Sequence, residues 1–101
     1  MYQLMKVNEI KSWIPEMERL KVSEVARSPR GFLTYYLEND GKLNEYWSSK
    51  RNSFISRTFA AFKKKPTYRR ALALIAWAFM PATIKTLKDL KLIHTIKTGK
   101  L

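Results

Sequence analysis

The chain has 101 residues, of which 46% are hydrophobic and 13% aromatic, and its formal net charge is +12 at pH 7. This length suits one domain with a small core, and the apolar content is well above that of a disordered basic tail. The chain has no cysteine, which excludes disulfides, thiolate zinc sites and thiol nucleophiles. We therefore expect a single folded domain, and the polar start favours a cytoplasmic or virion-associated location over secretion.

The positive charge is confined to one half of the chain. Residues 1–45 hold seven Lys/Arg and seven Asp/Glu, whereas residues 46–101 hold thirteen Lys/Arg and a single acid, Asp89. Such a concentration of charge repels itself in the folded state, and it is usually tolerated because the partner is a polyanion. The pattern therefore favours nucleic acid as the partner, with an anionic membrane surface second.

Two helices are predicted in the neutral half. The first begins near Pro15, whose missing N–H needs no partner in a first turn, and runs to about Arg27. The second begins at Ser28-Pro29, because serine is a favoured N-cap and proline a favoured first helical residue. It ends at the Asn-Asp-Gly turn of residues 39–41.

Three more helices are predicted in the basic half, at about residues 45–64, 68–80 and 82–94. Pro66 ends the first and Pro81 the second. The stretch 71–80 is apolar all round, which indicates a helix buried on most sides. A short strand at 92–97 is an alternative for the last segment, and we expect 97–101 to be mobile.

These elements predict an all-α fold of four to five short helices in one compact domain. The tryptophans Trp13, Trp47 and Trp77 are expected to anchor the core rather than to stack on bases. The residues predicted to form the centre of the core are Trp47, Phe54, Phe59, Leu72, Ile75 and Phe79.

Three cations spaced seven residues apart form the strongest candidate site. Lys50, Arg57 and Lys64 stay within about 40° of one another around a helix, so they line one edge of it. The cluster continues around Pro66 with Lys63, Lys65, Arg69 and Arg70. A row of cations can follow a phosphate backbone, because each neutralised phosphate releases counterions. No acid is interleaved, so we favour phosphate contact over a merely solvated face.

A second candidate site lies at the predicted helix start of Ser28-Pro29. Free N–H groups and the positive end of the helix dipole bind anions, and Arg27 and Arg30 flank this position. Gly31 would let another backbone or a ligand approach closely. A capped helix start with two exposed arginines explains the same residues equally well.

Arg51 falls inside the apolar stripe of the helix predicted at 45–64, between Trp47 and Phe62. A charge in that position needs a partner or a route to water. We expect it to reach solvent near the helix start or to pair with an acid, and the alternative is that it points into an anion site. The candidate acids are Glu38, Asp40 and Glu45.

Other function classes find less support. Residues 22–32 resemble a helix-turn-helix only weakly, because the turn is short and the second helix is apolar. His94 is the one histidine, and neither a metal-ligand spacing nor a glycine-rich phosphate loop occurs. We therefore expect no enzyme, no cofactor and no metal site. The stretch 71–80 lacks the polar face of an interfacial helix, so membrane binding ranks last.

One block of residues resembles a known group of proteins. Residues 28–34 (SPRGFLT), Trp47, Lys50-Arg51 and residues 54–57 (FISR) are similar to uncharacterised small basic proteins of large double-stranded DNA phages and viruses. The resemblance implies a viral origin, with a virion-internal or DNA-associated role or the inhibition of a host protein.

The sequence thus predicts a non-catalytic protein that binds nucleic acid through phosphates, with little reading of bases. The alternative is a structural or interaction protein whose basic face docks on an acidic protein surface, in a virion or on a host complex.

Overall fold

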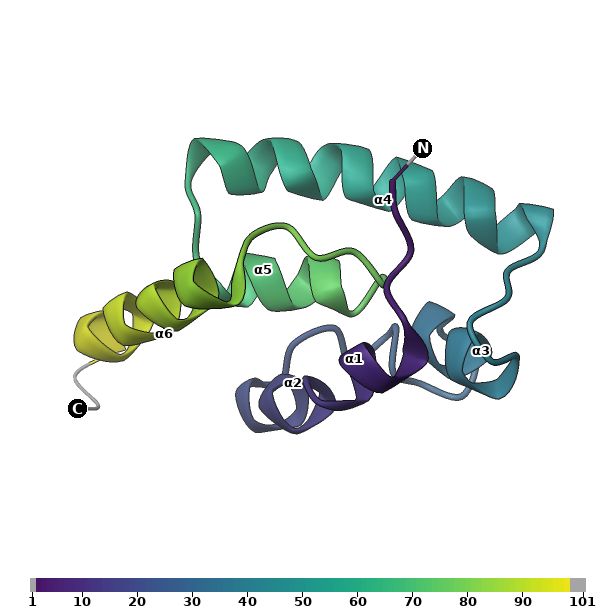
Figure 1. Cartoon of the computed structure of the whole chain (residues 1–101), viewed down its shortest axis with the longest axis horizontal. Coiled ribbons are helices and arrows are strands. Elements are labelled where there is room, and N and C mark those ends of the chain that lie inside the picture. Colours follow the sequence, from purple (N-terminus) through teal and green to yellow (C-terminus); the bar gives the residue numbers. More distant parts are fainter. Residues whose placement is uncertain (1, 99–101) are drawn as a thin grey trace.

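The computed structural model describes residues 2–98, apart from the side chains of residues 95, 97 and 98. Within that range the regular secondary structure is entirely helical, which confirms the all-α prediction (Figure 1). The helices are α1 (Val7–Lys11), α2 (Ile14–Leu20), α3 (Phe32–Glu38), α4 (Glu45–Lys64), α5 (Tyr68–Ile75) and α6 (Ile84–Thr98). None of the helices in this range is long and apolar enough to cross a membrane.

The central helix is α5, which packs against α4, α2 and α6. In Figure 1, α4 runs along one side of it, and α1, α2 and α3 lie on the other. The predicted burial of 71–80 is confirmed for most of its residues. Those that are buried are Ala71, Leu72, Leu74, Ile75, Ala76 and Ala78.

The core prediction is confirmed for its two aliphatic residues, whereas its four aromatic residues are less buried than predicted. Leu72 and Ile75 are fully buried, whereas Trp47, Phe54, Phe59 and Phe79 are only partly buried and pack against the core from its edge. The neutral half supplies much of the fully buried volume instead. Its large contributors are Ile10, Met17, Phe32, Leu33 and Tyr36.

The bounds predicted for α4 are confirmed. Asn44 caps its start, because the Asn44 side chain accepts a hydrogen bond of 2.9 Å from the N–H of Trp47. The helix ends at Lys64, two residues before Pro66. The basic edge therefore lies on one continuous helix of 20 residues.

Two helices end earlier than predicted. The helix expected to reach Arg27 ends at Leu20, where Lys21 turns the backbone left-handed with φ 55°. The helix expected to reach residue 80 ends at Ile75, and Ala78 has φ 63°. Both ends close with the paired hydrogen bonds of a Schellman motif, which usually places glycine at the left-handed position.

The Ser28-Pro29 prediction is also wrong, because α3 begins at Phe32 with Gly31 as its N-cap. The Ser28 hydroxyl donates to the Val25 carbonyl at 2.6 Å, so it stabilises a turn rather than a helix start. The close approach predicted at Gly31 is confirmed: a Cβ atom there would lie 2.2 Å from the Val25 carbonyl oxygen.

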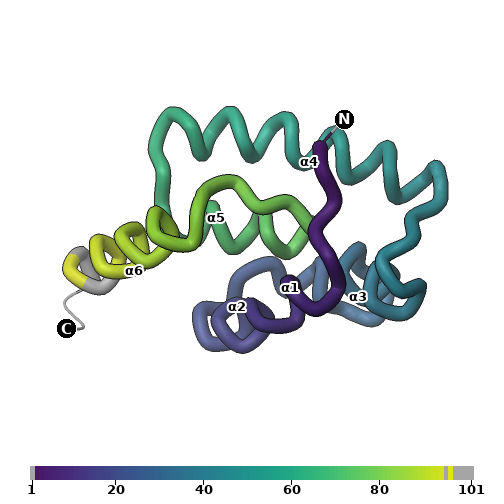
Figure 2. Tube along the Cα trace, in the orientation of Figure 1, coloured from purple at the N-terminus to yellow at the C-terminus, as the bar shows by residue number. Residues whose placement is uncertain are grey.

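The last helix, α6, continues to Thr98, so the alternative of a strand at 92–97 is wrong. Residues 99–101 of the tail that was predicted to be mobile lie outside the described part of the chain. In Figures 1 and 2, α6 points away from the other helices. Leu87 anchors it in the core, while Leu92, Ile93 and Ile96 are exposed.

Candidate nucleic-acid interface

Five exposed cations lie on α4 and at its C-terminal end, and we call them the α4 basic row. Its members are Lys50, Arg57, Lys63, Lys64 and Lys65. Lys50, Arg57 and Lys64 follow one edge of the helix, whereas Lys63 projects about 100° around the helix from Lys64 and Lys65 follows the last helical residue. Lys50 and Lys64 lie on one helix, fourteen residues apart, which corresponds to about 21 Å along the axis. No acid occurs in the sequence between Glu45 and Asp89, so no carboxylate on α4 beyond its first residue offsets this charge.

Two lysines of the row lie over aromatic rings one helical turn away. Lys50 Nζ is 5.2 Å from the centre of the Tyr46 ring, and Lys63 Nζ is 4.9 Å from the centre of the Phe59 ring. Contacts of this kind are worth about 0.5–1 kcal/mol at exposed sites. These contacts restrict the positions that the two ammonium groups occupy and leave the groups in contact with solvent.

Three arginines that the sequence assigned to phosphate binding contact the protein's own main chain. Arg27 and Arg69 both donate to carbonyl groups at the C-terminal end of α2. These carbonyls lie at or just beyond the negative end of the α2 dipole, where a guanidinium group is favourable, and at Met17 the guanidinium group adds a partner to the N–H of Val22. Arg70 donates to the Lys65 carbonyl at 2.6 Å, within the connection between α4 and α5. Each of these three side chains therefore has contacts within the fold, while Arg69 stays exposed.

The second predicted site is not assembled as an anion site at a helix start. Ser28 binds a carbonyl group, Arg27 faces α2, and α3 begins three residues after Pro29. The simpler interpretation, a capped helix start with two exposed arginines, is also wrong in part: Arg30 is exposed, but Arg27 is only partly exposed and Ser28 caps no helix.

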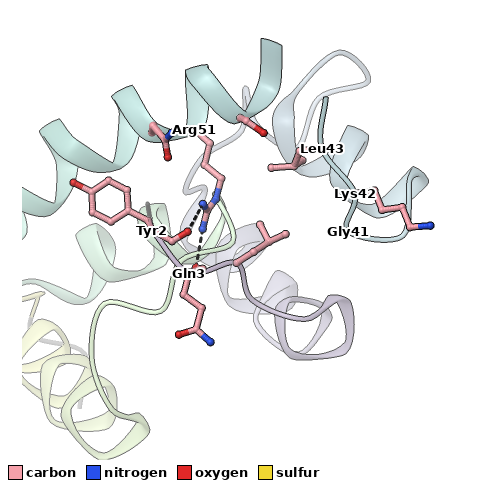
Figure 3. A pocket seen from close by; sticks show the side chains of 9 residues that line it. Tyr2, Gln3, Gly41, Lys42, Leu43 and Arg51 are labelled. Carbon is pink, nitrogen blue, oxygen red and sulfur yellow. Dashed lines mark hydrogen bonds between the residues drawn. The ribbon is translucent and has the colours of Figure 1, made fainter. Parts of the chain in front are cut away.

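Arg51 is buried, with only 3% of its surface exposed, and its partners are main-chain carbonyls rather than the predicted acids. Figure 3 shows the guanidinium group pointing from α4 to the N-terminal segment. The bonds run from Nε to Trp77 O at 2.7 Å, from Nη1 to Tyr2 O at 2.8 Å, and from Nη2 to Gln3 O at 2.8 Å and Ala78 O at 2.9 Å. Burial lowers the pKa of this guanidinium group.

A recess of about 520 Å³ adjoins Arg51, and Figure 3 shows it with Leu43 and Lys42 on the side away from Tyr2. Arginine has five N–H donors, and the four bonds to carbonyl groups use most of them. The geometry therefore favours a structural role for Arg51 over the anion site considered from the sequence.

A second recess, of about 430 Å³, lies inside the α4 basic row between Lys50 and Arg57. We call it the aromatic recess. Its other lining residues are Ser49, Ser53, Phe54 and Trp77. From the sequence, Phe54 and Trp77 were expected in the core. One feature of the sequence does indicate the recess: Lys50, Phe54 and Arg57 fall within about 60° of one another around a helix, so an aromatic ring and two cations share one face.

Within residues 2–98, no group of three or more His, Asp or Glu side chains is placed to hold a metal ion. Comparison of the chain with models of protein families, with curated proteins and with solved structures finds no match.

Proposed function

We propose that the protein binds nucleic acid through contacts between the α4 basic row and backbone phosphates. The observation that carries this proposal is the exposure of five cations along one rigid helix and its end, without an interleaved acid. Each cation that neutralises a phosphate releases condensed counterions, so the row contributes affinity that does not depend on base sequence. The viral origin implied by the resemblance stays a prediction.

The test is the salt dependence of binding to a labelled duplex and to a labelled single strand. Five phosphate contacts give a slope of log K against log salt of about −4 to −5 for duplex DNA and about −3 to −4 for a single strand. Replacing Lys50, Arg57 or Lys64 with alanine lowers the slope by about one each. Lys11→Ala is the control, because Lys11 is exposed on α1 in the neutral half.

Docking on an acidic protein surface is the second candidate. It is favoured by the exposed apolar side chains of Leu92, Ile93 and Ile96 on the projecting α6, because protein interfaces combine apolar and charged groups. Absence of binding to either nucleic acid at low salt contradicts the first proposal and leaves this one. A salt-independent affinity has the same consequence.

A further inference from the structure

The aromatic recess offers an apolar floor between two cations, and the flat part of this floor is the face of the Phe54 ring turned away from Trp77, because Phe54 and Phe32 cover both faces of Trp77. Phe54 and Trp77 stack with ring centres 4.6 Å apart and planes 16° from parallel, and both rings are partly buried. Lys50 and Arg57 line the same recess from two helical turns apart, and Ser49 and Ser53 add hydroxyl groups. Its volume of about 430 Å³ is within the range of sites that bind small planar molecules.

The floor is held in place from behind. Trp77 also stacks on Phe32, again with ring centres 4.6 Å apart, and Phe32 is buried. The Trp77 carbonyl accepts a hydrogen bond of 2.7 Å from the buried Arg51. Both the ring and the backbone of Trp77 are therefore fixed before any ligand arrives, which reduces the entropy lost on binding.

We infer that the aromatic recess receives one unpaired nucleobase, while the phosphates on either side of it lie on Lys50 and Arg57. The inference rests on the proposed function and makes it more specific: the ligand is a single strand rather than a duplex. In a duplex the base faces are covered by their neighbours, so no face is free to meet an aromatic floor. Stacking accepts any base, because every base has a π-face.

Three labelled probes of equal length test the inference: an oligothymidylate, the same backbone without bases, and a duplex. Fluorescence anisotropy at fixed salt should show the oligothymidylate bound about 5-fold to 100-fold more tightly than the abasic strand. Phe54→Leu keeps an apolar side chain but removes the ring, so it should bring the oligothymidylate down to the abasic level. Abasic binding should not change.

Phe59→Leu is the matched control for the recess, because Phe59 is a partly buried aromatic residue of α4 that does not line it; since the Phe59 ring lies under Lys63, the comparison uses the ratio of the two affinities rather than either affinity alone. It should leave the preference for bases intact, and thermal melts of both variants check that they fold. Equal affinity for the oligothymidylate and the abasic strand, with the salt slope retained, overturns the inference and leaves the proposed function standing. Failure to bind any of the three probes overturns the proposed function itself.

Discussion

The guanidinium group of Arg51, on α4, donates a hydrogen bond of 2.9 Å to the carbonyl of Ala78, the residue whose left-handed backbone turns the chain after α5. The same carbonyl accepts a hydrogen bond of 2.8 Å from the N–H of Met5. One oxygen atom thus joins the helix that carries the basic row, the turn that carries Trp77 and the N-terminal segment. Arg51 also binds the carbonyls of Tyr2 and Gln3, so a single side chain fixes three distant parts of the sequence.

Arg51→Lys should lower the free energy of unfolding by about 3–5 kcal/mol. A single ammonium group does not reach carbonyls on both segments, so the substitution leaves buried acceptors without donors and a buried charge poorly paired. Urea unfolding measures the loss. Arg57→Lys, at an exposed position of the same helix, should change stability by less than about 0.5 kcal/mol. Equal losses of unfolding free energy in the two variants would show that the carbonyl contacts of Arg51 do not stabilise the fold.

The sequence was sufficient to predict those features that depend on local pattern. The bounds of α4 follow from its apolar period and the nearby Pro66, and the exposure of the lysines follows from their high cost of burial. The ends of α2 and α5 were not predictable in this way. Lys21 and Ala78 adopt a backbone that glycine prefers, and the packing of the following segments is what selects it.

The roles of the arginines were beyond a local reading for the same reason. Arg27, Arg51 and Arg69 bind carbonyls that lie five or more residues away and, for two of them, in another part of the fold. Positive charge in the sequence does not distinguish a guanidinium group that binds a carbonyl from one that awaits a phosphate. The aromatic recess was not predictable in this way, because Lys50 and Phe54 lie within α4 and Trp77 lies in the turn after α5, and only the fold brings them together.

Lys21→Gly should raise the free energy of unfolding by about 0.5–1 kcal/mol. Lys21 is exposed and has φ 55°, a backbone region that is costly for residues with a Cβ atom and open to glycine. Lys88→Gly, at an exposed interior position of α6, should do the opposite and cost about 1 kcal/mol. Chemical denaturation of both variants gives the two signs. A loss of stability in Lys21→Gly would mean that the Lys21 side chain makes a contribution larger than the backbone strain.

Gly31→Ala should destabilise the domain by about 2–4 kcal/mol. Its Cβ atom would lie 2.2 Å from the carbonyl oxygen of Val25 and 2.3 Å from that of Ala26, and these are backbone atoms that a rotamer change does not move. Gly41→Ala is the comparison: its Cβ atom would meet side chains at ordinary distances, so only the φ of 80° opposes it, at about 1 kcal/mol. In thermal melts, Gly31→Ala should therefore have a clearly lower melting temperature than Gly41→Ala. The reverse order would contradict the close approach at Gly31.

The stability of the domain should fall in acid because of Glu16, which lies where α2, α5 and α6 meet. Burial alone would raise the pKa of this carboxyl group, but hydrogen bonds from Arg19, Lys91 and Tyr68 outweigh burial and lower the pKa to about 2. Arg19 donates at 2.7 Å and the Tyr68 hydroxyl at 3.0 Å. Because the pKa is lower in the folded protein than in the unfolded chain, the contribution of Glu16 is complete above about pH 4.5 and is lost as the pH falls toward 2.

Glu16→Gln isolates this contribution. The whole pKa shift corresponds to about 3 kcal/mol of folding free energy. Arg19 and Lys91 are half-exposed, so solvent screens their attraction to Glu16 and reduces this contribution to about 1–2 kcal/mol. Glu16→Gln should therefore be less stable than the parent by that amount near pH 6 and equal to it near pH 2. Glu24→Gln, which removes a carboxylate at an exposed position, is the control. Thermal melts across this range decide the matter, because an unchanged difference between Glu16→Gln and the parent would assign the effect to packing rather than to the charge of the carboxylate.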